Sequence, residues 1–270
     1  MTSTSVATGG VEFDPLSSGS TTLTVTGAGL TTVGTVNWPI TVSTPTISTG
    51  SSALGSGTQL QTGVSLGATA YGAVTVHIES SDPSLVVVAP NASTVGTAAI
   101  DVALTAPSTS VPFVIAALEG VTGTATLTIS APGFTSATYA VTVRGLGVEV
   151  FSLTPSIGAA SAGTDFLARL GGLNAAGNAI ETEYPLRVGG TPIVVTFDNS
   201  NAAVAQLSTS AGTAQSRTVT VGLGQSRSPN GVPSGGIRFL PLAAGSTVVT
   251  ASAPGVVRTL NGTQTVTVTP

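Results

Sequence analysis

The feature that most constrains the fold is a glycine-bounded segment, alternating between apolar and hydroxylated residues, that occurs three times. The copies read GSTTLTVTGAG at Gly19–Gly29, GTATLTISAPG at Gly123–Gly133 and GSTVVTASAPG at Gly245–Gly255. Successive side chains of a β-strand point to opposite faces, so each copy predicts a strand with one apolar and one hydroxylated face. The bounding glycines suit tight turns. The chain is therefore expected to repeat one β-rich unit.

A second alternating segment follows each copy and predicts a closing hairpin. These segments are WPITVS at Trp38–Ser43, YAVTV at Tyr139–Val143 and TVTVT at Thr265–Thr269. The copies recur at intervals of somewhat more than about 100 residues, which is too long for a solenoid repeat and suits one β-sandwich per repeat.

Two further segments share a strand–turn–strand pattern upstream of the second and third copies. They are VTVHIESSDPSLVVV at Val74–Val88 and VVTFDNSNAAVAQL at Val194–Leu207. The sequence therefore predicts one complete unit at residues 45–145 and another at 146–270. The second unit is longer mainly at 177–190 and 225–236, which are rich in turn residues and are expected to be loops.

The first 44 residues match only the back of a unit. GGVEFDPLSSGST at Gly9–Thr21 corresponds to GGIRFLPLAAGST at Gly235–Thr247, near the end of the last unit. Residues 1–44 are therefore predicted to be the C-terminal part of an incomplete domain. Its expected states are the remnant of a truncated domain, a segment docked on residues 45–145, or a segment that completes another chain by strand addition.

Composition supports an all-β fold and excludes several functional classes. The chain is 41% hydrophobic but only 7% charged and 4% aromatic, and it is rich in Val, Thr, Ser and Gly. It contains no cysteine, which excludes disulfides and thiolate chemistry. All seven basic residues are arginine and the net charge is −4, which argues against nucleic-acid binding. No segment reaches the ~18 apolar residues of a membrane span.

The order of these features resembles the bacterial immunoglobulin-like domains of group 2, which are repeated in intimin- and invasin-like surface proteins. SSDPS at Ser80–Ser84 followed by Val86–Val88 matches the turn of that family, and DNSN at Asp198–Asn201 matches it more loosely. The closing element is matched by Leu118–Thr128 and Leu242–Thr250, and by Leu16–Thr24 in the partial unit. The resemblance implies tandem immunoglobulin-like β-sandwiches that space and display other domains at a cell surface.

Few residues are candidates for chemistry. His77 is the only histidine and alternates with Val76 and Ile78, so it is expected to point outward from a strand. Asp82 and Asp198 are expected to cap turns through backbone amides. A glycosidase pair of Glu79 and Asp82 is disfavoured because residues so close on a turn offer no pocket.

Three other possibilities remain open at this level. Glu181 and Glu183, with Asp165 upstream, are the best candidates for a calcium site, on one face if the stretch is extended. The threonine ladders are similar to those of ice-binding surfaces, but outward threonine also suits any exposed strand. Asn91 and Asn261 begin N-glycosylation patterns.

The sequence thus predicts a non-catalytic structural region of an extracellular bacterial surface protein, without catalytic, cofactor-binding or metal-binding residues and without a cofactor. It would act as a spacer or stalk, or as a subunit of a filament or surface layer. Its expected partners are neighbouring immunoglobulin-like domains or copies of itself. The short junction at Arg144–Gly147 predicts stiff joints. An adhesin or carbohydrate-binding module is the alternative, although Trp38, Tyr71, Tyr139 and Tyr184 are scattered.

Overall fold

The computed structural model describes residues 1–270 except 1–12, 14–16, 30, 32–33, 35–36 and 70–71. In the described part nearly all regular structure is β, interrupted by two short 3-10 helices, Val232–Ser234 and Leu260–Gly262. No helix among these residues has the length and apolar character needed to span a membrane. The all-β class predicted from the sequence is confirmed.

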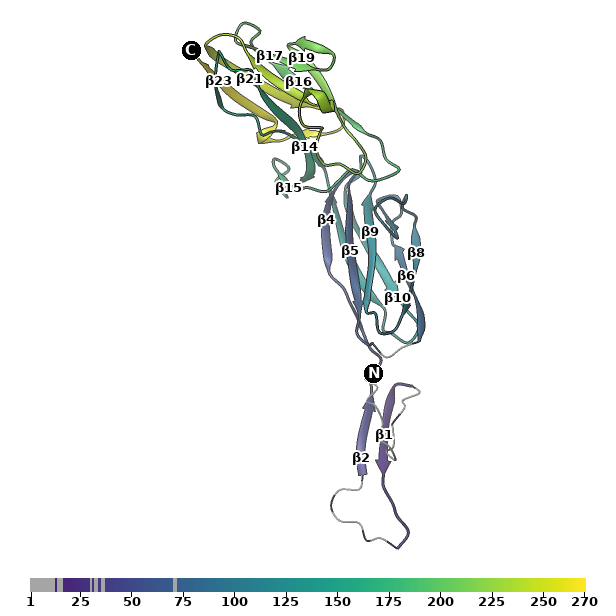
Figure 1. The fold of residues 1–270 in the computed structure, drawn as a ribbon. Helices are drawn as coiled ribbons and strands as arrows, with labels where there is room; N and C mark the ends of the chain where they lie inside the picture. The colour runs from purple at the N-terminus through teal and green to yellow at the C-terminus, as the bar shows by residue number, and fades with distance from the viewer. Residues whose placement is uncertain (1–12, 14–16, 30, 32–33, 35–36, 70–71) are drawn as a thin grey trace.

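A two-layer sandwich, here called the N-terminal sandwich, is built from strands between residues 45 and 145 (Figure 1). One sheet has the order β4-β11-β10-β6-β8 and the other the order β3-β5-β9-β7. The strands are β3 (Ile47–Ser48), β4 (Ser51–Gly55), β5 (Gln59–Leu66), β6 (Ala73–Ser80), β7 (Val86–Ala89), β8 (Ala99–Thr105), β9 (Ser110–Ala117), β10 (Gly123–Ser130) and β11 (Ala137–Arg144).

The core of this sandwich follows from the alternation read in the sequence. Leu127 and Ile129 of β10 are fully buried between the sheets, whereas Thr128 between them is exposed. Phe113 packs edge-on against Tyr139, with ring centroids 6.2 Å apart. Burial of such apolar side chains is the main favourable contribution to the free energy of folding.

A second sandwich, here called the C-terminal sandwich, is built from strands beyond Gly145. Its sheets have the orders β18-β17-β20-β14-β12-β22, with β15 also on β14, and β13-β23-β21-β16-β19. The strands are β12 (Leu146–Phe151), β13 (Ser156–Gly158), β14 (Thr164–Leu173), β15 (Ile180–Thr182), β16 (Ile193–Asn199), β17 (Ala205–Thr209), β18 (Gly212–Ala214), β19 (Ser216–Val221), β20 (Ile237–Pro241), β21 (Gly245–Ser252), β22 (Val257–Arg258) and β23 (Thr263–Thr269).

The two sandwiches share one strand order, since β13-β23-β21-β16-β19 repeats β4-β11-β10-β6-β8. The C-terminal sandwich has its own core, in which Phe166 and Phe197 are fully buried and pack edge-on at 5.0 Å. The additional strands β15, β18 and β22 lie at its margins. The repeat seen in the sequence is therefore a repeat of topology as well.

The partial unit forms an antiparallel hairpin of β1 (Gly19–Thr24) and β2 (Asn37–Val42), which lies beyond the end of the N-terminal sandwich in Figure 1. Its register equals that of the closing hairpins of the two sandwiches. The first glycine of each hairpin faces a valine: Gly19 faces Val42, Gly123 faces Val143 and Gly245 faces Val268. That residues 1–44 belong to an incomplete domain stays a prediction, since much of the segment lies outside the described residues.

One turn prediction is confirmed and another is wrong. Asp82 Oδ1 accepts hydrogen bonds from the backbone N–H of Ser84 at 3.0 Å and from its hydroxyl at 2.6 Å, as expected for a turn cap. Asp198 instead lies within β16, with its side chain exposed. The corresponding turn is capped by Asn201, whose Oδ1 accepts the Ala203 N–H at 3.1 Å. β16 ends at Asn199 and so includes the first two residues of the DNSN motif.

Candidate functional site

The joint between the two sandwiches brings together groups from many parts of the sequence. Only Gly145 separates β11 from β12, and its carbonyl accepts the Leu173 N–H at 3.0 Å. The Ser56 N–H donates to the Arg144 carbonyl at 2.8 Å on the other side of the connection. Leu146, the first residue of β12, is already buried. The connection is short and fixed to both sandwiches.

Residues 183–190 of the C-terminal sandwich, here called the docking loop, contact the N-terminal sandwich through backbone hydrogen bonds. The Gln59 N–H donates to the Pro185 carbonyl at 2.9 Å, and the Arg187 N–H donates to the Gly57 carbonyl at 2.9 Å. Thr58 and Leu186 thereby form an isolated antiparallel bridge. This bridge is a second, noncovalent attachment between the sandwiches, in addition to the chain connection at Gly145.

Two side-chain contacts reinforce the bridge. The Arg187 guanidinium holds the Glu119 carboxylate through Nε at 2.9 and 3.0 Å and through Nη2 at 2.6 Å. The Arg187 side chain is only 12% exposed. Gln59 Oε1 accepts the Val188 N–H at 2.9 Å, and its Nε2 donates to the Ala92 carbonyl at 2.8 Å. A bidentate ion pair between arginine and a carboxylate fixes the orientation of the two groups as well as their distance.

A close approach of two backbones lies at the centre of the joint. A Cβ placed on Gly55 would lie 2.7 Å from Gly172 Cα, and one placed on Gly172 would lie 2.6 Å from the Gly55 nitrogen. Gly55 ends β4 of one sandwich and Gly172 lies in β14 of the other. Glycine is required at both positions because any side chain would push the backbones apart.

Arg144 adds a contact across the same joint. This last residue of β11 donates from Nη1 to the Leu173 carbonyl at 3.3 Å and forms an ion pair with Glu181 of β15. The final strand of the first sandwich is therefore tied to two elements of the second.

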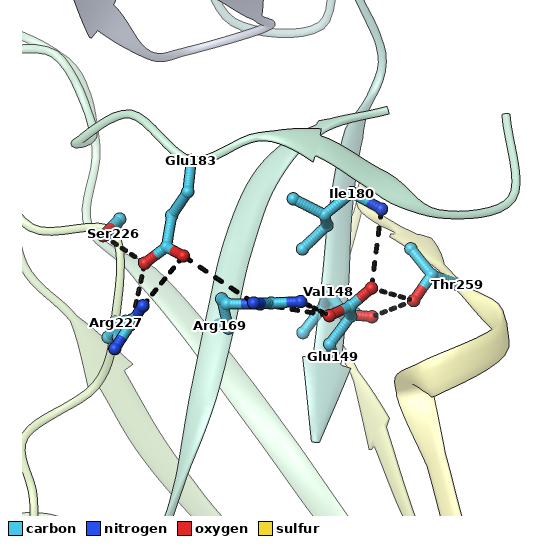
Figure 2. Close-up of polar contacts among 8 residues, drawn as sticks. All are labelled: Val148, Glu149, Arg169, Ile180, Glu183, Ser226, Arg227 and Thr259. Carbon is cyan, nitrogen blue, oxygen red and sulfur yellow. Dashed lines mark hydrogen bonds and ion pairs between the residues drawn. The ribbon is translucent and has the colours of Figure 1, made fainter. Parts of the chain in front are cut away.

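A ladder of charged groups supports the docking loop from within the C-terminal sandwich (Figure 2). Glu149 of β12 is 1% exposed and binds the Arg169 guanidinium, with Nε at 3.1 Å. Its other oxygen accepts the Thr259 hydroxyl at 3.1 Å and the Ile180 N–H at 3.4 Å. A buried carboxylate requires such compensation. The contact to Ile180 attaches β15, from which the docking loop follows.

Glu183, the first residue of the docking loop, continues this ladder. Its carboxylate accepts Arg227 Nε at 2.5 Å and Nη2 at 2.9 Å, and the Ser226 hydroxyl at 3.0 Å. The hydrogen bond from Arg227 is the main cause that lowers the pKa of Glu183, with further help from Ser226 and Arg169 against partial burial. The guanidiniums of Arg169 and Arg227 both lie over the Phe151 ring, at 4.7 and 4.4 Å.

A cavity of about 450 Å³ opens at the joint, lined from both sandwiches mainly by apolar side chains, including Leu146, Leu186 and Ile193. Glu119 is its charged lining residue, and its carboxylate is held by Arg187. The cavity therefore has room for a small apolar group. The carboxylate of Glu119 in its lining is already paired with Arg187.

The residues considered for catalysis lie on an open sheet surface. His77 of β6 points outward as expected, with Nδ1 2.7 Å from Asp101 Oδ1 and Nε2 3.9 Å from Glu79 Oε2. Glu79 is exposed on β6, and Asp82 caps the turn that follows this strand.

The proposed calcium ligands are not brought together. Glu181 pairs with Arg144, Glu183 pairs with Arg227, and Asp165 pairs with Arg238 through Nε at 2.8 Å. Hydrogen bonding from Arg238 lowers the pKa of Asp165. In the part of the chain that the structure describes, no group of three or more His, Cys, Asp or Glu residues could hold a metal ion. Each carboxylate has an arginine as its counter-ion instead.

The remaining candidates are separated from one another. Asn91 Oδ1 accepts the Ser93 N–H at 3.0 Å within an exposed turn, and Asn261 lies in the second 3-10 helix. Trp38 is exposed on the hairpin, Tyr139 is buried in the N-terminal core, and Tyr184 packs against that core from the docking loop. Tyr71 lies outside the described residues. The aromatic residues that the structure places form no common binding surface.

The sequence did not single out the residues that build the joint. Arg187, Glu119 and Gln59 are separated by many residues along the chain and carry no motif. The signal that pointed toward them was the extra length of 177–190, which the sequence assigned to a loop without indicating what it contacts. The adjacent glycines Gly171 and Gly172 are a second such signal, because glycine within a strand often marks a close approach of another backbone.

With the shared strand order and the joint established, the chain is a protein of tandem immunoglobulin-like β-sandwiches. No protein-family model matches it, and no curated protein matches its sequence. The structure of CBD12 from CALX1.2 is 10% identical over 81% of this chain and 96% of that one, with a TM-score of 0.36.

Two proteins of Yersinia pseudotuberculosis also have similar structures. InvD is 16% identical over 85% of this chain and 59% of that one, with a TM-score of 0.31. The adhesin InvE is 15% identical over 80% of this chain and 56% of that one, with a TM-score of 0.28. All three TM-scores are below 0.5, so the fold assignment depends on the sheet topology described above.

Proposed function

We propose that this chain is a non-catalytic, stiff spacer of an extracellular bacterial surface protein, in which tandem immunoglobulin-like sandwiches hold a fixed mutual orientation. In a stalk, filament or surface layer, such a segment transmits position and mechanical load along its length. Backbone ladders and apolar cores supply the resistance, and the low charge offers few sites for counter-ions.

The observation that carries the proposal is the second attachment between the sandwiches. A single covalent connection at Gly145 would leave rotation about a few dihedral angles. The bridge between Thr58 and Leu186 opposes that rotation, and so does the ion pair of Arg187 with Glu119. The contact of Gly55 with Gly172 leaves no room for sliding. These contacts support a stiff joint.

The stiffness is tested by measuring the distance distribution between two spin labels, one on each sandwich. The chain contains no cysteine, so Thr128→Cys and Thr265→Cys, both at exposed strand positions, create the only labelling sites. We expect one narrow distribution in the parent chain. A broad distribution in the parent would show that the sandwiches move freely and would reject the stiff spacer.

A glycine substitution then tests whether the observed joint causes the stiffness. Gly172→Ala places a Cβ 2.6 Å from the Gly55 nitrogen and should shift or broaden the distribution. Gly222→Ala is the matched control, because a Cβ there meets nothing within 4 Å. Equal effects of the two substitutions would show that the contact of Gly55 with Gly172 does not cause the stiffness.

The proposed location requires a separate test. Antibodies against residues 45–145 should label intact bacteria that produce the protein, without permeabilisation. Labelling only after permeabilisation would reject the surface assignment while leaving the stiffness measurement unaffected.

A further inference from the structure

In both sandwiches the first strand of the closing hairpin, β10 or β21, pairs along its outer edge with a strand from earlier in the chain. β10 pairs antiparallel with β6, and β21 pairs antiparallel with β16. The strand that supplies this pairing is already central, since β6 also pairs with β8 and β16 also pairs with β19. Each of these strands is therefore committed on both edges within its own sandwich.

A serine completes this edge pairing in each sandwich. Ser81, just after β6, donates its N–H to the Thr126 carbonyl at 2.9 Å, and its hydroxyl accepts the Thr126 N–H at 3.0 Å. Ser200, just after β16, does the same with Val248, at 3.0 and 2.9 Å. Both serines precede a turn residue, Asp82 or Asn201, that caps the following turn.

The hairpin of β1 and β2 has the same edge. Thr22 lies three residues after Gly19, as Thr126 lies after Gly123 and Val248 after Gly245. Since Thr126 directs its N–H and C=O away from β11, the equal register indicates that Thr22 directs these groups away from β2. Thr22 faces Pro39, which lacks an N–H and is tolerated at a position without a hydrogen bond between the strands.

Among the residues that the structure describes, no strand occupies the outer edge of β1, and every residue of β1 is exposed. The hairpin also exposes large apolar side chains, with Leu23 at 43%, Trp38 at 47% and Val25 at 54%. Neither β1 nor β2 carries a charged residue. Uncharged edges are the ones that accept further strands, and exposed apolar patches mark interaction sites.

We propose that the outer edge of β1 is an acceptor site for a β-strand of a different protein. The partner strand runs antiparallel to β1, carries Val or Ile at alternate positions, and ends in a serine followed by Asp or Asn. Its serine N–H donates to the Thr22 carbonyl and its hydroxyl accepts the Thr22 N–H. Strands β6 and β16 are already paired on both edges, in this chain and in any second copy of it, so neither supplies the partner strand. This site goes beyond the spacer role and does not depend on a stiff joint.

The test uses Trp38, the only tryptophan, as a fluorescent reporter on the hairpin. The probe is a synthetic peptide with the sequence AVTVHIESSDPSL of Ala73–Leu85, titrated into the full chain. We expect a saturable blue shift of the Trp38 emission, because the bound strand and its apolar side chains reduce the exposure of the indole.

A modified peptide separates strand addition from nonspecific adsorption without changing the protein. Methylation of the Ser81 backbone nitrogen removes the donor to the Thr22 carbonyl and should weaken binding about tenfold. In the chain, Thr22→Pro removes the edge N–H and should abolish the shift, whereas Thr41→Pro on β2 leaves that N–H in place. Equal binding of the methylated and unmethylated peptides would overturn the proposal.

Three further results would also overturn it. The first is no emission shift at millimolar peptide. The second is a buried-indole emission in the dilute chain alone, which would show that the chain covers its own hairpin. The third is a blue shift that depends on protein concentration in the absence of peptide, which would identify a second copy as the occupant. None of these results bears on the stiffness of the joint.

Discussion

At the scale of single residues, Glu149 shows how a weakly charged protein uses one buried acid. Its carboxylate is almost inaccessible to water, yet Arg169, Thr259 and Ile180 supply donors to both of its oxygens. These donors come from β14, from the segment before the second 3-10 helix and from β15. The acid therefore fixes three segments to β12 at one point, in a way that an apolar side chain could not.

This arrangement predicts a large cost for removing only the arginine. Arg169→Met should destabilise the C-terminal sandwich by about 3 kcal/mol, because the Glu149 charge stays buried without its counter-ion. The double variant Glu149→Gln with Arg169→Met should recover much of that loss. Urea unfolding followed by circular dichroism measures both. A double variant less stable than Arg169→Met would contradict the explanation.

At the scale of elements, the docking loop depends on an ion pair at its first residue. Glu183 is held by Arg227, and four residues later the Arg187 N–H reaches the Gly57 carbonyl of the other sandwich. The ion pairs of the charged ladder thus help to hold the docking loop in position at the joint. A loop tethered only at its ends would lose more entropy on docking.

Acid should loosen this element. The pKa of Glu183 is lowered below its ordinary value of 4.5, chiefly by the Arg227 hydrogen bond. Its stabilising contribution is therefore present above pH 4.5 and is lost as the pH falls through the lower folded-state value. Hydrogen exchange at the Arg187 amide, corrected for intrinsic rates, should show falling protection in that acid range.

Two variants serve as comparison for this measurement. Glu183→Gln should reduce the protection of the Arg187 amide already at neutral pH and remove the acid step. Glu79→Gln, on the exposed face of β6, should behave as the parent. Protection in the parent that does not change across the acid range would show that the ion pair does not hold the loop.

At the scale of the whole molecule, each sandwich has its own buried cluster, one around Phe113 and one around Phe197. Apart from Tyr184, which packs against the N-terminal core from the docking loop, the contacts described between the sandwiches are polar or involve backbone at the joint. Cooperative unfolding follows shared apolar burial, so the two cores should respond separately to changes within them.

Phe113→Ala and Phe197→Ala test this division. Each removes a fully buried ring and should cost its own sandwich about 3–5 kcal/mol, with little effect on the other. Differential scanning calorimetry should therefore show one transition displaced by Phe113→Ala and a different one displaced by Phe197→Ala. Displacement of both transitions by either substitution would make the molecule one cooperative unit and reject the division at residue 145.

Much of the fold could be predicted because alternation is a local property. The segments TATLTIS and TVTVT lie in strands with the expected faces buried, and the turn at Asp82 forms as its motif predicts. Asp198 was misplaced because the end of a strand depends on its neighbours, here β19 and β21, rather than on the turn residues alone. The sequence alone could not show that the acids considered for calcium binding pair with arginines, because some of these arginines lie far along the chain.

The sequence by itself determined the all-β class, the repeating hairpins and the apolar faces, since a period of two residues and glycine-bounded turns act within a few residues. Only the tertiary structure decided how the units are joined. The pairing of Arg187 with Glu119, the contact of Gly55 with Gly172 and the burial of Glu149 join residues distant in the chain. Such contacts depend on where whole sheets come to lie, and no short-range pattern records that.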